Sequence, residues 1–193
     1  MTIEALTFNQ LSQKAKENAI SIYLEKYLPD QWHESVIEDA KSIGALMGIE
    51  IDKVFFTGFS CQGDGACFNG SFSYQKGAVE QVKQYAPLDT KLHRIAEDYA
   101  AVQRKAFYKL VGKVQHEGHY YHSNCTEISV EHADDQYRDI GELYADMKDV
   151  LRAFMDWIYD ELEKDYDFQA SESEAAECFD ANDIKFTESG KIH

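Results

Sequence analysis

Proline and long apolar segments are scarce in this sequence. Its 193 residues include only two prolines, and no run of 18 apolar residues occurs. A membrane-spanning helix needs a run of that length, so the sequence excludes an ordinary transmembrane helix. The opening MTIEALTFNQLSQKAKENAI lacks a basic stretch followed by an apolar one. We therefore expect no secretory signal, and a cytoplasmic protein whose four cysteines are reduced thiols.

Basic residues are also few. The sequence has 35 acidic residues against 19 basic ones, which gives a net charge of −16. This balance argues against direct binding to the phosphates of nucleic acid. The excess is uneven, because residues 1–130 hold 16 acids and 13 bases whereas residues 131–193 hold 19 acids and 6 bases. Such asymmetry is typical of an acidic interaction surface, although a merely soluble protein can show it too.

The spacing of apolar residues predicts the elements of the fold. Apolar residues at steps of three and four predict helices over 9–27, 32–47, 78–85, 89–110, 137–166 and 173–181. Runs of β-branched and aromatic residues predict strands over 49–59, 66–74, 113–122 and 125–132, with a short strand or hairpin near the C-terminus. We therefore expect one α+β domain over residues 1–193. Its small antiparallel sheet has about four or five strands, built from hairpins and packed with about five or six helices, including a long acidic C-terminal one.

The stretch GFSCQGDGACFNG, residues 58–70, has the most unusual composition. A phosphate-binding loop would be followed by a helix, but a strand is predicted here. A calcium loop needs several carboxylates, and this stretch offers only Asp64. We expect Gly63, Asp64 and Gly65 to supply the positive φ values of a hairpin turn.

Cysteine and histidine side chains suggest two further kinds of site. If the two predicted hairpin loops meet, Cys61, Cys67, His122 and Cys125 would form a set of four zinc ligands, although their spacing matches no standard zinc motif. A Cys125–His122 or Cys67–His119 pair with Asp64 would have the parts of a thiol-dependent enzyme. The alternative to both is a set of buried thiols and structural histidines.

The clearest periodic pattern is acidic. Carboxylates recur at steps of three and four along the predicted helix 137–166 and just beyond it, and we take them as the candidate partner-binding residues. They are Asp139, Glu142, Asp146, Asp149, Asp156, Asp160, Glu163 and Asp167. On one helix this row would be about 42 Å long at 1.5 Å per residue. Like charges so placed repel one another, so the row is either a solvated face or a surface for a basic partner.

Four segments of the sequence resemble a family of small phage and prophage proteins. They are residues 38–74, 91–110, 118–125 and 181–193, and the first contains the specific core GFSCQGDGACF. Members are mostly uncharacterised, and some are labelled antitoxins of a toxin–antitoxin stability system. The resemblance implies an origin in a phage or other mobile element, so the cytoplasm expected above would be that of the host cell.

Taken together, these observations favour a binding protein over an enzyme. We expect an acidic phage protein that inhibits a basic, nucleic-acid-binding host protein or complex, as an anti-CRISPR or an antitoxin does, by mimicry of nucleic acid. We expect no cofactor, no direct nucleic-acid binding and no membrane contact, and a homodimer stays open. The alternatives are a metal- or thiol-dependent enzyme at the Cys/His hairpins and a non-enzymatic phage accessory protein.

Overall fold

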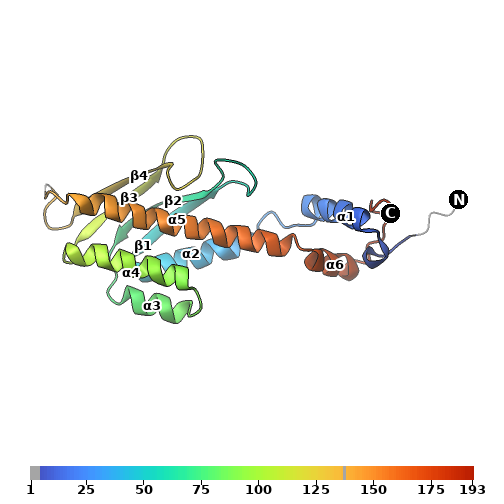
Figure 1. Ribbon diagram of the computed structural model, residues 1–193, viewed down its shortest axis with the longest axis horizontal. Helices are drawn as coiled ribbons and strands as arrows, with labels where there is room; N and C mark the ends of the chain where they lie inside the picture. Colours follow the sequence, from blue (N-terminus) through green and yellow to red (C-terminus); the bar gives the residue numbers. More distant parts are fainter. Residues whose placement is uncertain (1–4, 137) are drawn as a thin grey trace. The chain divides into compact units, whose positions relative to one another are not determined.

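The computed structural model describes residues 5–136 and 138–193 (Figure 1). The chain forms two compact units. The larger unit is the continuous segment Ser35–Leu162, and the smaller unit combines Met1–Glu34 with Glu163–His193. The prediction of one domain over residues 1–193 stays a prediction, because two compact units can still unfold together.

A four-stranded antiparallel sheet forms the centre of the larger unit. Its strands are β1 (Ile49–Phe56), β2 (Ala66–Ser73), β3 (Leu110–His116) and β4 (Thr126–His132), and they pair in the order β1-β2-β3-β4. β4 alternates buried and exposed residues along its whole length. A sheet with this alternation packs one face on a core and leaves the other polar.

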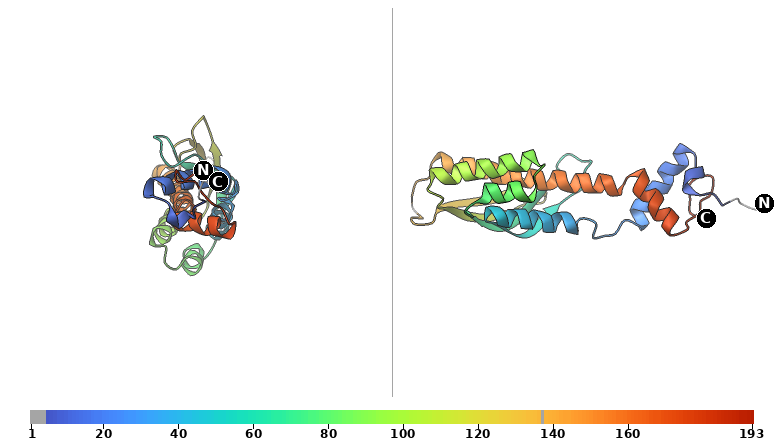
Figure 2. Two further views of the ribbon diagram at one scale, coloured as in Figure 1. Left: turned by 90° about the vertical axis from the view of Figure 1, so that its right-hand side faces the viewer. Right: turned by 90° about the horizontal axis from the view of Figure 1, so that it is seen from below.

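Helices cover one face of this sheet (Figures 1 and 2). They are α2 (Glu34–Met47), α3 (Ala78–Tyr85), α4 (Thr90–Lys105) and α5 (Glu142–Gln169), whose last seven residues belong to the smaller unit. Phe68 of β2 meets Phe154 of α5 with ring centroids 6.2 Å apart, and Tyr144 of α5 donates a hydrogen bond to the Ile128 carbonyl of β4. The opposite face of the sheet carries polar side chains, among them Glu50 and Lys113, around shallow hollows.

Several element boundaries differ from the prediction. Strand β3 spans Leu110–His116 instead of 113–122, α1 spans Gln13–Lys26 instead of 9–27, and α5 ends at Gln169 instead of 166. Helix α4 ends at Lys105, before the predicted Leu110, because Phe107 and Tyr108 adopt left-handed φ values of 53° and 62°. Helix α5 begins at Glu142; the predicted start, Tyr137, lies outside the described residues. Asp139 precedes the helix and accepts a hydrogen bond from the Gly141 backbone nitrogen, so this candidate carboxylate is not part of the helical row.

The smaller unit has its own aromatic core. It contains the 3-10 turn η1 (Phe8–Gln10), α1 (Gln13–Lys26) and α6 (Glu172–Ala181). Phe179 packs against Phe8 at 5.4 Å and against Phe186 at 4.8 Å between ring centroids. Backbone hydrogen bonds join Leu6 to Phe186, so the two ends of the chain meet in this unit.

The predicted α+β class is confirmed, with six α-helices and four strands in the described residues. The long acidic helix is α5, and the short α6 follows it. The C-terminal hairpin is present as a bridge between Phe186 and Ile192. No helix in residues 5–136 and 138–193 is both long and apolar enough to cross a membrane.

Candidate functional site

Helix α5 carries most of the predicted acidic row. The members that lie on it are Glu142, Asp146, Asp149, Asp156, Asp160, Glu163 and Asp167. Two of them pair with lysines of α4: Asp146 lies 2.9 Å from the Lys105 ammonium, and Asp160 pairs with Lys91. Part of the acidic row therefore attaches α5 to α4. The lysines also offset the repulsion between neighbouring carboxylates.

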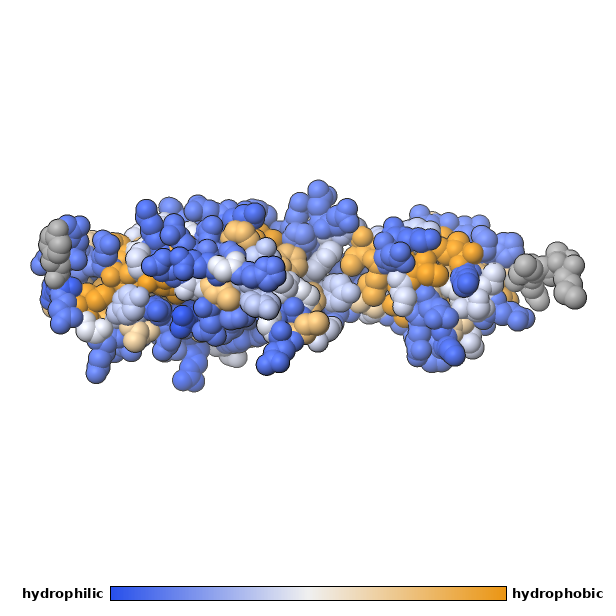
Figure 3. Space-filling model, turned by 90° about the horizontal axis from the view of Figure 1, so that it is seen from above, coloured by the Kyte–Doolittle hydropathy of each residue, from blue (hydrophilic) through white to orange (hydrophobic). Residues whose placement is uncertain are grey.

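The other members of the acidic row that lie on α5 in the larger unit face solvent. Glu142, Asp149 and Asp156 are exposed, and none of them forms an ion pair with any residue of the described chain. In the space-filling view, hydrophilic residues cover most of the visible surface of this unit, with apolar residues between them (Figure 3). Exposed carboxylates without a partner are available to a basic molecule.

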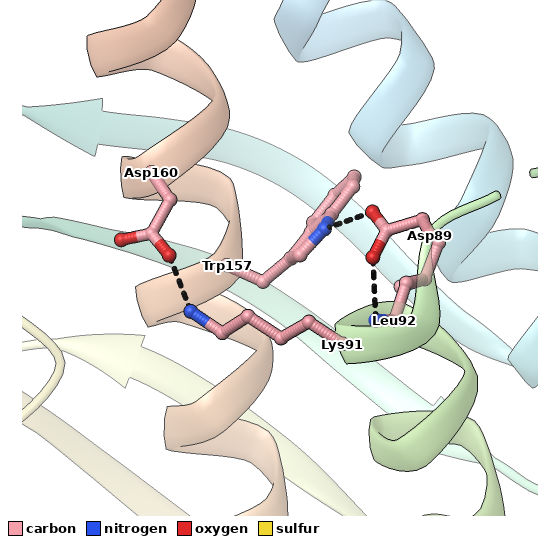
Figure 4. A network of polar contacts seen from close by, with 5 residues as sticks. All are labelled: Asp89, Lys91, Leu92, Trp157 and Asp160. Carbon is pink, nitrogen blue, oxygen red and sulfur yellow. Dashed lines mark hydrogen bonds and ion pairs between the residues drawn. The ribbon is translucent and has the colours of Figure 1, made fainter.

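A polar network fixes α5 against the start of α4 (Figure 4). One carboxylate oxygen of Asp89 accepts a hydrogen bond from the Leu92 backbone nitrogen at 2.8 Å and so caps α4. The other accepts from the Trp157 indole nitrogen at 2.7 Å. Trp157 is buried, and its N–H would otherwise lack an acceptor there. These bonds fix the position of α5 along α4, and that position sets the shape of the space between the two helices.

That space is a groove of about 370 Å³ in the larger unit. Its floor is apolar and its rim is mostly acidic. The floor comprises Ile95, Ala101, Val102, Val150 and Ala153; the rim comprises Asp98, Lys105, Asp146 and Asp149. Ala153 occupies the one step of the acidic row that has no carboxylate, and this small side chain leaves room above the floor.

The groove suits a long basic side chain. Arginine and lysine carry an apolar stem below a charged head, and the stem can lie on apolar surface while the head stays hydrated. Here the floor would receive the stem, and the carboxylates of Asp98 and Asp149 are exposed to receive the head. Asp98 makes only a loose contact with Arg94, at 3.8 Å, and such surface pairs contribute little.

The glycine-rich stretch forms the connection between β1 and β2. Asp64 accepts hydrogen bonds from the backbone nitrogens of Cys61 at 2.6 Å and Ser60 at 3.0 Å. These bonds, the Cys61 bond above all, hold the pKa of the Asp64 carboxyl below its usual value. The expectation of three positive φ values was wrong in part, because only Gly63 has one, at 102°. Asp64 instead closes the turn with its side chain.

The two hairpin loops meet, as the zinc hypothesis required. A Cβ placed on Gly65 would lie 2.6 Å from the Cβ of His122, so only glycine fits at this crossing. The ring of His122 approaches the Cys125 sulfur at 3.4 Å. Cys67 is buried beside them, and burial, with a smaller effect of Cys125, raises its pKa to about 12.

The four candidate zinc ligands do not form one cluster. Cys61 is exposed on the first loop, and no three His, Cys, Asp or Glu side chains of the described chain come together in a way that could hold a metal ion. Of the two predicted thiol–imidazole pairs, Cys125 and His122 are within hydrogen-bond distance, whereas Cys67 and His119 form no hydrogen bond in the part of the chain that the structure describes. The hairpin tips therefore contain one thiol–imidazole contact and no metal centre within the described residues.

Comparison with known proteins gives a family. The pattern that defines a family described as Domain of unknown function (DUF8835) matches residues 32–172, which include the whole larger unit. The chain belongs to the DUF8835 family. None of the curated proteins and none of the solved structures matches it. The resemblance to phage proteins stays a prediction beside this finding.

Sequence reasoning missed the residues that α4 contributes to the site of this DUF8835 member. Asp98 and Lys105 line the groove, and Lys91 pairs with Asp160. The signal was present in the predicted helix 89–110, where charged residues alternate with an apolar stripe. Which helix lies beside α5 depends on tertiary packing, and a single sequence does not encode that in any local spacing.

Proposed function

We propose that the protein binds and inhibits a basic, nucleic-acid-binding protein or complex, with the α4–α5 groove as its main contact. The observation that carries this proposal is the apolar floor bordered by the exposed carboxylates of Asp98 and Asp149. An arginine of the partner fits both parts, because its stem is apolar and its guanidinium pairs with carboxylates. Asp156, exposed farther along α5, extends the acidic surface beyond the groove.

Nucleic-acid mimicry is the form of inhibition that we propose. A protein of net charge −16 is drawn to the positive surface that a nuclease or a DNA-binding complex offers its substrate. Occupying that surface excludes the nucleic acid. An anti-CRISPR and an antitoxin both fit this description, since each blocks such a surface, and the predicted phage origin gives a setting for either. The host cytoplasm is the proposed place of action.

Charge reversal with a matched control tests the proposal. The variant Asp149→Lys/Asp156→Lys alters the proposed surface, and Glu177→Lys/Asp180→Lys makes the same change of net charge on exposed positions of α6. Each is titrated with an arginine-rich peptide and used to capture proteins from host-cell extract. We expect the first variant to weaken binding at least about tenfold, because a like charge at the contact is repulsive. The second should bind as the unchanged protein does.

The groove has its own variant. Ala153→Leu adds apolar volume to the floor and leaves the net charge at −16. It should weaken binding of the arginine-rich peptide, because the larger side chain fills the groove. Equal weakening by both charge-reversal variants would mean that only net charge matters and would contradict a localised surface. If added nucleic acid did not release the captured proteins from this protein, that result would contradict the mimicry.

The Cys125–His122 contact favours a second candidate function, a nucleophilic thiol. The imidazole lies where it can accept the thiol proton, and the thiolate would then attack an electrophile. Alkylation by iodoacetamide tests this directly: a sulfur–carbon bond forms, iodide leaves, and the proton passes to the imidazole. We expect His122→Ala to slow labelling of Cys125 at neutral pH. Labelling that is no faster than that of exposed Cys61 would contradict a catalytic thiol.

A further inference from the structure

The turn between α4 and β3 has a backbone that does not suit its side chains. Phe107 and Tyr108 follow one another with φ values of 53° and 62°. L-residues rarely adopt this left-handed region, since the Cβ crowds the following carbonyl, and glycine or asparagine usually takes such positions. Both residues are also exposed, Phe107 at 75% and Tyr108 at 45% of their surface. Core packing therefore does not account for two large aromatic residues here, and such strain often marks a functional position.

The turn is nevertheless held firmly. Gln103 is fully buried, and its side chain bonds both backbone groups of Leu110: its oxygen accepts from the nitrogen at 3.1 Å, and its nitrogen donates to the carbonyl at 2.8 Å. The Gln103 carbonyl in turn accepts a hydrogen bond from the Tyr108 backbone nitrogen at 2.7 Å. The two exposed rings are thus presented by a turn that is fixed in advance of any binding.

A hollow of about 560 Å³ opens beside these rings. It is lined by Tyr74, Lys76, Gly77, Phe107, Tyr108 and Lys109. The rings of Tyr74 and Tyr108 lie 4.6 Å apart between centroids at an interplanar angle of 32°, and Tyr74 rests on the buried Tyr99 at 6.1 Å. A volume of this size holds a small organic ligand. The hollow therefore combines aromatic surface with two ammonium groups.

Both lysines are available to an anion. Lys76 is exposed and forms no ion pair with any described residue. Lys109 contacts Asp134 at 3.4 Å, and both side chains of that pair are about half exposed. A surface pair of this kind is weak, so a better-placed anion can replace Asp134. The local charge at the hollow is thus opposite to that of the protein as a whole, which disfavours a cationic ligand here.

We propose that this hollow binds a planar aromatic anion of the nucleoside monophosphate class. The base stacks on the exposed tyrosine and phenylalanine rings, as bases stack on aromatic side chains in proteins that bind single strands. The phosphate pairs with the ammonium groups of Lys76 and Lys109. The site is separate from the α4–α5 groove, shares no lining residue with it, and does not depend on a protein partner.

Calorimetric titration with adenosine 5′-monophosphate tests the proposal, with adenosine and inorganic phosphate as separate probes. We expect the monophosphate to bind more tightly than either part. Tyr108→Gly removes one ring and keeps a residue suited to the left-handed φ, so it should fold and bind at least about tenfold more weakly. Lys76→Gln should weaken the monophosphate but not adenosine. Tyr120→Ala, at another exposed tyrosine, should leave binding unchanged.

Several results would overturn the proposal. They are no heat of binding with the monophosphate, equal affinity for inorganic phosphate alone, or unchanged binding by Tyr108→Gly. Circular dichroism spectra of each variant show whether it keeps the fold, and a second variant, Phe107→Gly, is expected to weaken binding by the same reasoning. Loss of binding in Tyr108→Gly and Phe107→Gly, with retained binding in Tyr120→Ala, would support the site.

Discussion

The left-handed backbone at Phe107 makes a quantitative prediction about stability. Inside a helix or strand, a variant with glycine is less stable to unfolding than one with alanine by about 0.5–1 kcal/mol, because glycine loses more conformational freedom on folding. At φ 53° the order should reverse. Alanine there bears the left-handed cost of about 1–2 kcal/mol, and glycine does not. Subtracting the unfolded-state cost of glycine, about 0.4–1 kcal/mol, leaves Phe107→Gly more stable than Phe107→Ala by about 1 kcal/mol.

Comparing these two variants with each other, and not with phenylalanine, isolates the backbone effect. Both lack the ring, so the apolar contacts of its buried quarter cancel. For a chain of 193 residues, about 1 kcal/mol corresponds to a Tm difference of about 2–4 °C. The matched control is Ala145→Gly on α5, an exposed helical site, where glycine should lower Tm.

Thermal unfolding measured by tryptophan fluorescence is the assay. The protein has two tryptophans, Trp32 in the smaller unit and Trp157 in the larger, so a Trp32→Phe background reports on the unit that contains the turn. If Phe107→Ala proved as stable as Phe107→Gly, the left-handed conformation would carry no cost in the folded protein, and the strain argument for the aromatic hollow would fail.

Three further perturbations follow from the contacts described above. Asp89→Ala removes the cap of α4 and the acceptor of the Trp157 indole, so urea unfolding should show a loss of about 2 kcal/mol, and a loss near zero would contradict the network. Gly65→Ala forces a Cβ against His122 and should lower Tm, whereas an unchanged Tm would mean that the loops do not meet. Asp64 has a pKa below its usual value, so its carboxylate stabilises the folded state above the unfolded pKa of about 3.9, and this contribution is lost as pH falls through the lower folded pKa. Asp64→Asn should therefore be less stable than the unchanged protein at neutral pH, with a difference that shrinks in acid; a difference independent of pH would contradict this role.

The sequence predicted the elements whose signals are local. The predicted helix 78–85 has the same bounds as α3, and the strand run at 66–74 ends one residue beyond β2. The error at α4 has a physical cause. Ala106, Phe107 and Leu110 continue the apolar stripe of the helix, and neither Phe107 nor Tyr108 is a residue type that marks a left-handed stop. The apolar pattern therefore predicted a helix as far as Leu110. Hydrogen bonds from the buried Gln103 side chain to Leu110, and from the Tyr108 backbone nitrogen to the Gln103 carbonyl, fix the turn instead.

The candidate site was predictable in part. The spacing of carboxylates on α5 located one side of the groove, but Asp139 falls before the helix because it bonds the Gly141 nitrogen. The pairing of Asp146 and Asp160 with α4 depends on which helix packs alongside, and that information is not in the spacing of either helix. The closeness of His122 and Cys125 was a sequence hypothesis that the loop geometry supports, whereas Cys61 lies on the other loop and is exposed.

The smaller unit is assembled from both ends of the chain, and this has a consequence for folding on the ribosome. The larger unit is one continuous stretch, so all of its residues have been synthesised once Leu162 is added. The smaller unit needs the bond between Leu6 and Phe186, two residues at opposite ends of the sequence. Closing so long a loop is slow, and the aromatic residues of the N-terminal segment cannot pack until Phe179 and Phe186 have been synthesised. A C-terminal truncation before Phe179 would therefore remove the ring against which Phe8 and Tyr23 pack, and would turn a well-packed end into a site of aggregation.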